Sequence, residues 1–359
     1  MVHEFKKIGV AAAVAGALAA SGAAQALTLG EPGGALLVPH VVYDSAAQVN
    51  TMVGITTGDF VPSGQYGTVS GEGKGCEGGL KQLHWYFFSK KSVHLADGTI
   101  KVSCNDFARL DWGYIITNPN RPFPSLNGVT GYLVISSNDT RTDNTPSNYT
   151  LYGSSYLIQG NWASEAFIPV LPLRDSVDSS VDEVKYAGNI PKQVNPLSAG
   201  MPLADHVNKA ARFSLRYFLG DAGLEGSTRW VLWFPDNSGD THGNGKINRA
   251  AVPVDIYDAD EVAISTTVAL PDELNVIDAS KVDGTVNDPT AHAITEITGM
   301  TPAKNTGFAL FQLADTSNTA TGSQYSRAGV AFSLVGIGGA NATQVQTDLA
   351  HERGIISAP

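Results

Sequence analysis

Apolar and polar residues alternate over many short segments of this chain, which has 359 residues. Residues 211–220 (ARFSLRYFLG), for example, place Phe213, Leu215 and Tyr217 on one side of an extended chain. A repeat of two residues is the period of a β-strand, whose successive side chains point to opposite faces. Comparable segments bounded by turn-forming residues occur at 35–43, 48–56, 80–88, 131–136, 155–159, 166–170, 251–257, 262–270, 306–313 and 330–337. The pattern predicts an all-β fold of antiparallel sheets.

Two of these segments predict more than a strand. Residues 80–88 (LKQLHWYFF) are apolar on both faces, which is typical of a strand covered on both sides within a β-sandwich. Residues 35–43 contain Pro39, which has no N–H to donate to a neighbouring strand, so we expect an edge or a bulge there rather than a central position in a sheet.

Three further expectations rest on shorter signals. Asp97 and Gly98 form a dipeptide that is favoured in two-residue hairpin turns, so a turn is expected between two short strands there. Residues 112–117 continue the strand pattern. Residues 229–234 (RWVLWF) are expected to pair with residues 211–220 as a hairpin.

The domain organisation is predicted from a change in composition. Residues 175–204 are poor in aromatic residues and rich in Asp, Ser and Pro, as in a linker or long loop. This division predicts two antiparallel β-sandwich domains in tandem, at residues 27–174 and 205–359. A single sandwich with elaborated loops also fits the length of the chain.

The first 26 residues have the pattern of a bacterial-type secretory signal. Lys6 and Lys7 precede an apolar run at residues 8–20, and Ala24-Gln25-Ala26 form a small-x-small cleavage site. The apolar run is shorter than the ~20 residues that span a bilayer, and no later run approaches that length. We therefore expect an exported protein of the periplasm, cell surface or medium that begins at Leu27 and has no membrane span.

The charge of the chain restricts its partners. Removal of residues 1–26 leaves 21 basic and 33 acidic residues, a formal charge of −12. Binding of nucleic acid requires clustered Lys and Arg, and the sequence has no such cluster. We therefore expect no nucleic-acid partner, and a neutral or cationic polymer as the partner if there is one.

Cys76 and Cys104 are the only cysteines. An even count in an exported chain favours a disulfide between them, which would stabilise the fold by about 3 kcal/mol through the entropy of loop closure. Two separate free thiols are the alternative.

One loop resembles a calcium-binding loop. Asp240, His242 and Asn244 occupy its first, third and fifth positions, which makes Asp240 and Asn244 the candidate metal ligands. The match is incomplete, because position three is His and position twelve is Ala251, where a bidentate Glu belongs. A polar hairpin loop without metal is the simpler interpretation, so no cofactor is expected apart from this candidate calcium ion.

The other combinations of reactive residues are weak. His84 and His94 lie on neighbouring expected strands and would form a metal site only together with a reduced Cys104. Asp272-Glu273 is a carboxylate pair of the kind that glycosidases use, but adjacency in sequence does not give the spacing of the two groups. A stacking platform for sugar rings would have to come from the five tryptophans, which are Trp85, Trp112, Trp162, Trp230 and Trp233. No catalytic motif is present, so no catalytic residue is assigned.

Several segments resemble a group of exported bacterial surface or periplasmic proteins without an assigned function. The resemblance lies in GGALLVPHVVYD, LHWYFFSKKSVHLADGTIKVSCNDFARLDW, NGVTGYLVIS, YGSSYLI, TRWVLWFPDN, VDIYDADE and GFALFQL, and it spans nearly the whole mature chain. It implies export and an all-β architecture, and it transfers no active site.

The sequence thus favours an exported, non-enzymatic envelope or surface protein with a structural or adhesive role. Its partners would be other copies of the chain or an envelope polysaccharide. The alternatives are a glycan-binding module or glycan-active enzyme, and a calcium-stabilised binding module.

Overall fold

A computed structural model shows that the protein is all-β, as the alternating pattern predicts. It describes residues 33, 35–58, 81–120, 122–137, 150–160, 163–173, 186–187, 190–191, 212–221, 224–233, 252–260, 263–282, 305–312, 330–339, 342–349 and 351–352. Every pairing between the described strands is antiparallel.

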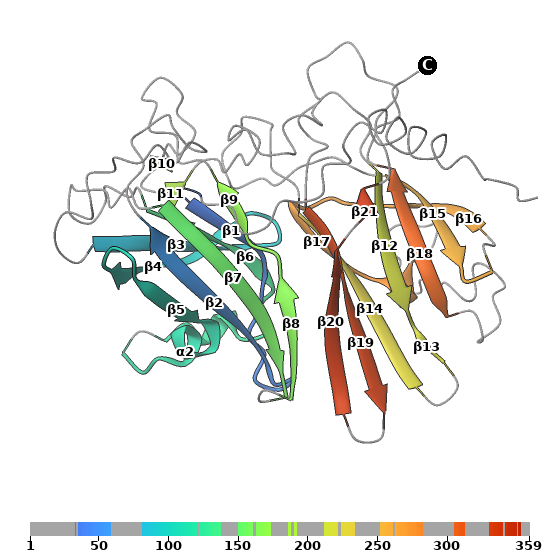
Figure 1. The fold of residues 1–359 in the computed structure, drawn as a ribbon, viewed down its shortest axis with the longest axis horizontal. Helices are drawn as coiled ribbons and strands as arrows, with labels where there is room; N and C mark the ends of the chain where they lie inside the picture. The colour runs from blue at the N-terminus through green and yellow to red at the C-terminus, as the bar shows by residue number, and fades with distance from the viewer. Residues whose placement is uncertain are drawn as a thin grey trace, which may run out of the picture.

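The first half of the chain forms two facing sheets (Figure 1). Sheet I has the order β5 (Phe107–Asp111), β2 (Val49–Gly58), β7 (Thr150–Gln159) and β8 (Ser164–Ile168). Sheet II has the order β4 (His94–Val102), β3 (Lys81–Ser89), β6 (Gly131–Ser136), β1 (Ala35–Val41) and β9 (Leu171–Leu173). The short helix α2 (Trp112–Thr117) follows β5, and the 3-10 turn η1 (Pro124–Leu126) precedes β6.

The second half forms two more sheets. Sheet III has the order β13 (Gly220–Asp221), β14 (Leu224–Trp233), β19 (Val330–Gly339) and β20 (Ala342–Leu349), and β17 (Leu274–Asp278) also pairs with β14. Sheet IV has the order β16 (Ala263–Val268), β15 (Val252–Asp258), β18 (Thr306–Gln312), β12 (Arg212–Phe218) and β21 (His351–Glu352). The 3-10 turn η4 (Ala279–Lys281) follows β17, and a separate pair, β10 (Tyr186–Ala187) and β11 (Ile190–Pro191), falls inside the predicted linker.

Sheet II is buried on both faces around β3, as residues 80–88 predict. Trp85 shares a row with Ile135 and Leu36. A Cβ placed on Gly153 of β7 would lie 2.9 Å from the Leu36 side chain, so this row faces sheet I. Phe88 is on the opposite face, where its ring stacks on Tyr132.

That opposite face of sheet II packs against sheet III. The Tyr132 ring meets the Trp233 indole edge to face, with their centroids 5.9 Å apart. One continuous hydrophobic core therefore includes the first half of the chain together with Val231, Trp233, Leu274, Val330, Phe332 and Leu334. We call this contact between sheets II and III the seam.

Sheet III is likewise buried on both faces. Trp230 and Leu232 belong to a second core between sheets III and IV, where the Trp230 ring meets Phe311 with centroids 5.3 Å apart. Val231 and Trp233, the alternate residues of the same strand, belong to the core at the seam. The apolar segment RWVLWF thus supplies side chains to both cores.

The division into two domains stays a prediction. Strand pairing among the described residues stays within residues 35–173 or within residues 212–352, apart from the small β10–β11 pair. The core at the seam joins these two ranges, and β8 and β20 lie side by side where they meet (Figure 1).

Of the two alternatives expected at Pro39, an edge or a bulge, the structure has the bulge. The pairing of β1 with β6 shifts register between Val38 and Val41, around Pro39 and His40. β1 lies between β6 and β9, so Pro39 is accommodated by a bulge in an interior strand.

Three local predictions are wrong. Asp97 and Gly98 lie within β4, because Gly98 is needed beneath the Trp85 indole, where a Cβ would approach ring atoms to 2.5 Å. Residues 112–117 form α2, whose first turn is capped by Asp111. β12 and β14 are not a hairpin; they belong to opposite sheets of one sandwich, because β12 pairs with β18 and β21.

Candidate binding face

Several predicted site residues lie outside the described residues. These include the candidate calcium ligands Asp240 and Asn244, and also Cys76. Cys104 is described; it is not free, and it packs half-buried against the core at the seam. The calcium loop and the Cys76–Cys104 bridge therefore stay predictions.

The four tryptophans that the structure describes do not form the stacking platform that the sequence suggests. Trp112, Trp230 and Trp233 are fully buried, and Trp85 is 5% exposed. Trp162 lies outside the described residues. The four described indoles are in the cores because the alternation of their strands, or their place at the start of α2, turns them inward.

Glu273 of the predicted carboxylate pair is part of the seam. It is 1% exposed, and its carboxylate accepts a hydrogen bond of 2.8 Å from the Tyr132 hydroxyl and another from the Ser92 hydroxyl. The neighbouring Leu274 N–H donates to the Lys90 carbonyl at 3.1 Å. These contacts hold Glu273 in a structural position without access to a substrate in solution.

His84 and His94 do come together, as their strands predict, but around Asp97. The His84 Nε2 lies 3.2 Å from one Asp97 carboxylate oxygen, and the His94 Nε2 lies 3.4 Å from the other. The His84 ring stacks on Tyr86 with centroids 4.2 Å apart. Among the described residues, no group of three or more His, Cys, Asp or Glu side chains is arranged to hold a metal ion.

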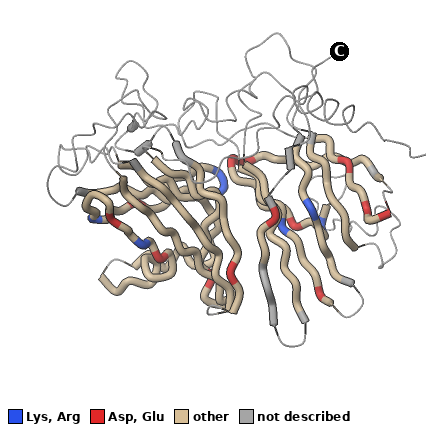
Figure 2. Tube along the Cα trace, viewed as in Figure 1, with Lys and Arg blue, Asp and Glu red and all other residues tan. Residues whose placement is uncertain are grey.

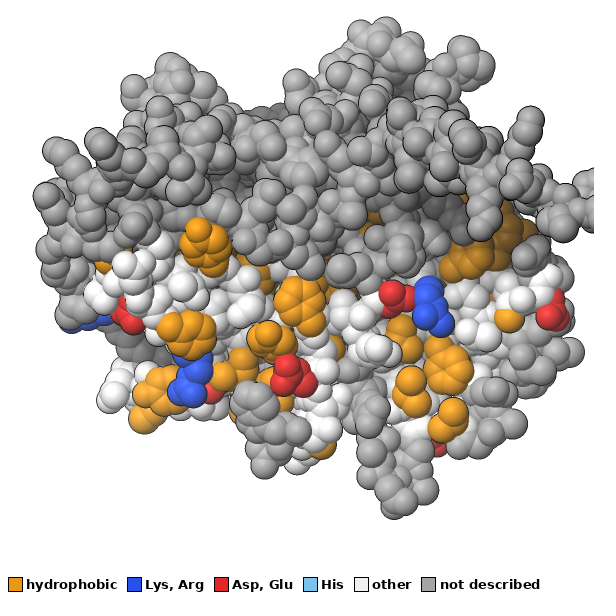
Figure 3. Space-filling view, in the orientation of Figure 1, with side chains coloured by type: hydrophobic (Ala, Val, Ile, Leu, Met, Phe, Trp, Pro, Cys, Tyr) orange, Lys and Arg blue, Asp and Glu red, His pale blue; other side chains and the backbone are white. Residues whose placement is uncertain are grey.

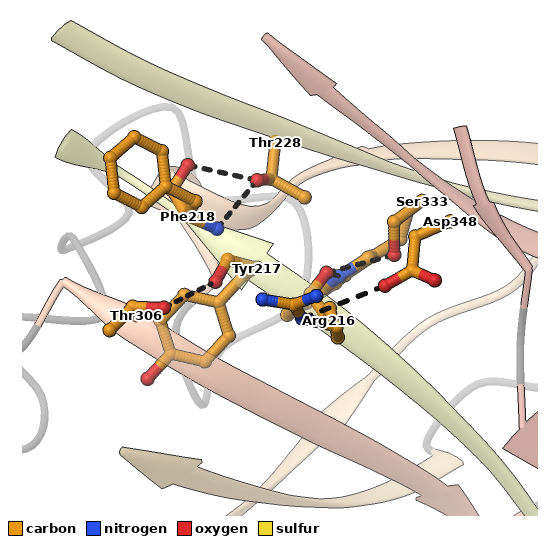
Figure 4. A network of polar contacts seen from close by, with 8 residues as sticks. Arg216, Tyr217, Phe218, Thr228, Thr306, Ser333 and Asp348 are labelled. Atoms are coloured by element: carbon orange, nitrogen blue, oxygen red, sulfur yellow. Dashed lines mark hydrogen bonds and ion pairs between the residues drawn. The ribbon is translucent and has the colours of Figure 1, made fainter. Parts of the chain in front are cut away.

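In the second half, the polar contacts around Arg216 join β12 to β14, β19 and β20, and Figure 4 shows those with Ser333 and Asp348. The Arg216 Nε lies 3.6 Å from the Asp348 carboxylate of β20, and the Ser333 hydroxyl of β19 donates to the Arg216 carbonyl at 2.8 Å. The Trp230 indole N–H of β14 donates to the same carbonyl at 3.0 Å. This network secures β12 of sheet IV to sheet III, which is a structural task.

The strongest candidate for a binding surface is the outer face of sheet I, which points away from sheet II. In β5, Ala108 and Leu110 are buried, whereas Phe107 and Arg109 are exposed, with 66% of Phe107 accessible. Tyr152 of β7 is 39% exposed on the same face. We define the aromatic face as this surface together with Tyr114 of α2, the helix that follows β5; its residues are Phe107, Arg109, Tyr114, Tyr152, Tyr156 and Phe167.

The pairing of β5, β2 and β7 arranges the aromatic face in rows. Phe107 and Tyr152 are both register partners of Thr56, so they lie at the two ends of one row. Two strand spacings separate them, which is roughly 10 Å. In the next row, Arg109 and Ser154 are the partners of Gly54.

Gly54 leaves the centre of the aromatic face without a side chain of its own. A Cβ at this position would lie 2.9 Å from the Ser154 hydroxyl oxygen and 3.0 Å from the Phe107 ring. The Phe107 ring therefore leans over a backbone without a side chain. A larger residue at Gly54 would push the ring away from the sheet.

Helix α2 adds Tyr114, which is 62% exposed. The Asp111 carboxylate accepts a hydrogen bond of 3.1 Å from the Tyr114 N–H and another of 2.9 Å from the Asn50 amide. The Asn50 side-chain oxygen in turn accepts 2.7 Å from the Gly113 N–H. These contacts anchor the first turn of the helix to β2, so Tyr114 is held on a rigid support.

At the other side of the aromatic face, the rings of Tyr156 and Phe167 meet edge to face, with centroids 6.0 Å apart. Figure 3 shows hydrophobic side chains in several groups over the first half of the chain, at the left of the view, with basic and acidic side chains among them. The charged positions in the described part of the first half of the chain are few and of both signs (Figure 2). The exposed ones on the outer face are Arg109 and Glu165.

Sequence reasoning missed the aromatic face, although the signal is present. Residues 107–111 (FARLD) alternate large or charged residues with Ala and Leu. Because the smaller apolar residues face the core, the large ones must face outward. The sequence suggests the tryptophans for sugar stacking instead, because they have the largest aromatic side chains.

Comparison with protein-family models, curated proteins and solved structures finds no match to this chain. No described helix has the length and apolar character needed to cross a membrane.

Proposed function

We propose that the protein is an exported, non-enzymatic component of the bacterial envelope or cell surface with an adhesive role, and that it makes contact through the aromatic face. The observation that carries the proposal is the exposure of two aromatic side chains, Phe107 of β5 at 66% and Tyr114 of the helix α2 at 62%. Large exposed apolar patches mark interaction sites in soluble proteins. Aromatic side chains are enriched at such sites because they offer much contact area with few rotatable bonds.

The case for export rests on the sequence. Residues 1–26 have the charged, apolar and small-x-small parts of a secretory signal. An adhesive role needs no catalytic residues, which agrees with the lack of a catalytic motif in the sequence. Fractionation of the expressing cells should recover the chain outside the cytoplasm, with Leu27 as its N-terminal residue.

Binding is tested by sedimentation of the purified mature chain with envelope fragments. The wild type should sediment with the fragments, whereas a variant carrying Phe107→Ser, Tyr114→Ser and Tyr152→Ser should stay in the supernatant. Leu224, which is 51% exposed in sheet III, provides the control Leu224→Ser. Equal sedimentation of the triple variant and the wild type would remove the aromatic face from the proposal, and no sedimentation of either would remove the adhesive role.

Self-association is the second partner class that the sequence suggests. β16 and β4 are outer strands of their sheets, and outer strands can add a strand from another chain. Light scattering of the mature chain over a range of concentrations tests this possibility. A constant mass up to high concentration would exclude assembly by strand addition.

A further inference from the structure

We infer that the aromatic face binds a neutral polysaccharide chain that lies across the strands, with sugar rings stacked on Phe107 and Tyr152. This inference rests on the proposed function and specifies the partner of the same surface. It is carried by the kind of side chain exposed, by the spacing of the rows and by the charge of the protein.

The kind of side chain separates this surface from other exposed apolar positions. Six large hydrophobic residues of the described chain are exposed, and the three on the aromatic face are all aromatic: Phe107, Tyr114 and Tyr152. The other three are aliphatic and lie elsewhere: Val93, Leu95 and Leu224. Flat aromatic rings match the apolar faces of pyranose rings. A protein–protein interface would use aliphatic side chains as well.

The spacing of the rows suits an extended chain of sugars. Phe107 and Tyr152 stand at the two ends of the row through Thr56, and their α-carbons are roughly 10 Å apart, which is about the length of a disaccharide unit in an extended glycan. Thr56 is exposed between them and offers a hydroxyl group. A sugar chain across the strands would place alternate rings over the two aromatic side chains.

The neighbouring row supplies polar groups at the right level. In this row Gly54, over which the Phe107 ring leans, lies between Arg109 and Ser154. The Arg109 guanidinium has several donors, and the Ser154 hydroxyl both donates and accepts. Sugar hydroxyls need both kinds of partner when they leave water.

Charge argues for a neutral chain over an anionic one. The whole protein has a formal charge of −11, and the exposed charges on this face, Arg109 and Glu165, are one of each sign. An acidic polysaccharide, a nucleic acid or an anionic lipid surface would gain little from a single arginine against this background. A neutral glycan would not meet this repulsion.

The test is calorimetric titration of the whole mature chain with neutral hexasaccharides of glucose, xylose, mannose and N-acetylglucosamine, and with polygalacturonate as an acidic probe. At least one neutral hexasaccharide should bind, and polygalacturonate should not. Phe107→Ala and Tyr152→Ala should each lower the affinity at least tenfold. Phe107→Trp should retain binding because it keeps a flat ring, and Leu224→Ala should match the wild type.

Three results would overturn the inference. The first is absence of binding to all four neutral sugars while the chain still sediments with envelope fragments, which would leave the proposed function standing with another partner. The second is sugar binding that is unchanged in Phe107→Ala and Tyr152→Ala, with melting temperatures showing that both variants are folded. The third is self-association of the wild type that the same two substitutions abolish, since that would make a second copy the occupant of the face.

Discussion

Replacing His40 with leucine should remove part of the acid sensitivity of the fold. His40 lies in the bulge of β1 and is 1% exposed. Burial is the largest cause that lowers its pKa to about 3; the positive charges of Arg229 and, less strongly, Lys90 lower it further, and a backbone hydrogen bond acts in the opposite direction. In the unfolded chain, the pKa of histidine is about 6.5.

The sign of the effect follows from proton binding. Between pH 6.5 and pH 3, the unfolded chain holds one proton on His40 that the folded chain does not hold, because the folded pKa is about 3. The free energy of unfolding therefore falls as the pH falls through this window, and the stabilisation is fully present above it. With about 1.4 kcal/mol per pH unit for one proton, the loss between pH 6 and pH 4 is about 2.5 kcal/mol.

The assay is urea unfolding of the wild type and of His40→Leu at pH 6, 5 and 4, followed by the fluorescence of the buried tryptophans. Leucine has a similar size and takes up no proton, so the variant should lose about 2.5 kcal/mol less than the wild type over this range. Carboxylates contribute equally to both proteins and cancel in the difference. Parallel pH profiles would refute the assignment of a buried neutral His40.

Three other measurements test the seam, the packing of β3 against β4, and the metal loop. Glu273→Ala should destabilise the protein by about 2 to 4 kcal/mol in urea unfolding, because it removes the carboxylate that accepts from the buried Tyr132 hydroxyl. Glu273→Gln should cost less, because its amide oxygen can still accept a hydrogen bond. Equal stability of the wild type and both variants would contradict this account. Gly98→Ala should lower stability by about 1 to 3 kcal/mol in the same assay, since its Cβ would approach the Trp85 ring to 2.5 Å, and an unchanged midpoint would show that the ring moves freely. Calcium and chelator should leave the melting temperature unchanged, because the loop that begins at Asp240 lacks a carboxylate at its twelfth position. Stabilisation by about 2.7 kcal/mol at calcium a hundredfold above Kd would instead establish the site, provided that Asp240→Asn abolishes it.

The strand content and the buried faces of this protein follow from local pattern. The apolar character of residues 80–88 on both faces predicts burial on both sides, and β3 lies between sheet I and the seam. The missing N–H of Pro39 predicts an edge or a bulge, and β1 has a bulge there. These predictions succeed because they concern a single strand and the direction of its side chains.

The errors concern residues whose local signals are shared by two structures. Asp97-Gly98 favours a turn, but the Trp85 indole of the next strand needs a residue without a side chain at Gly98. The segment 112–117 is too short for its apolar period to distinguish a strand from a helix. The side chain of Asp111 caps its first turn and thereby favours the helix α2. In both cases a contact with another part of the chain selects the structure.

The sequence by itself determined that the chain forms antiparallel strands, and which side of each strand is apolar. Only the tertiary structure decided which strands pair, that sheet III packs against sheet II, and that Phe107 and Tyr152 share one exposed face. The reason is physical: alternation is a property of consecutive residues, whereas strand order and exposure depend on contacts between residues far apart in the chain. The apolar strands RWVLWF and LKQLHWYFF required burial on both faces, and the fold met that requirement by packing sheets II and III together.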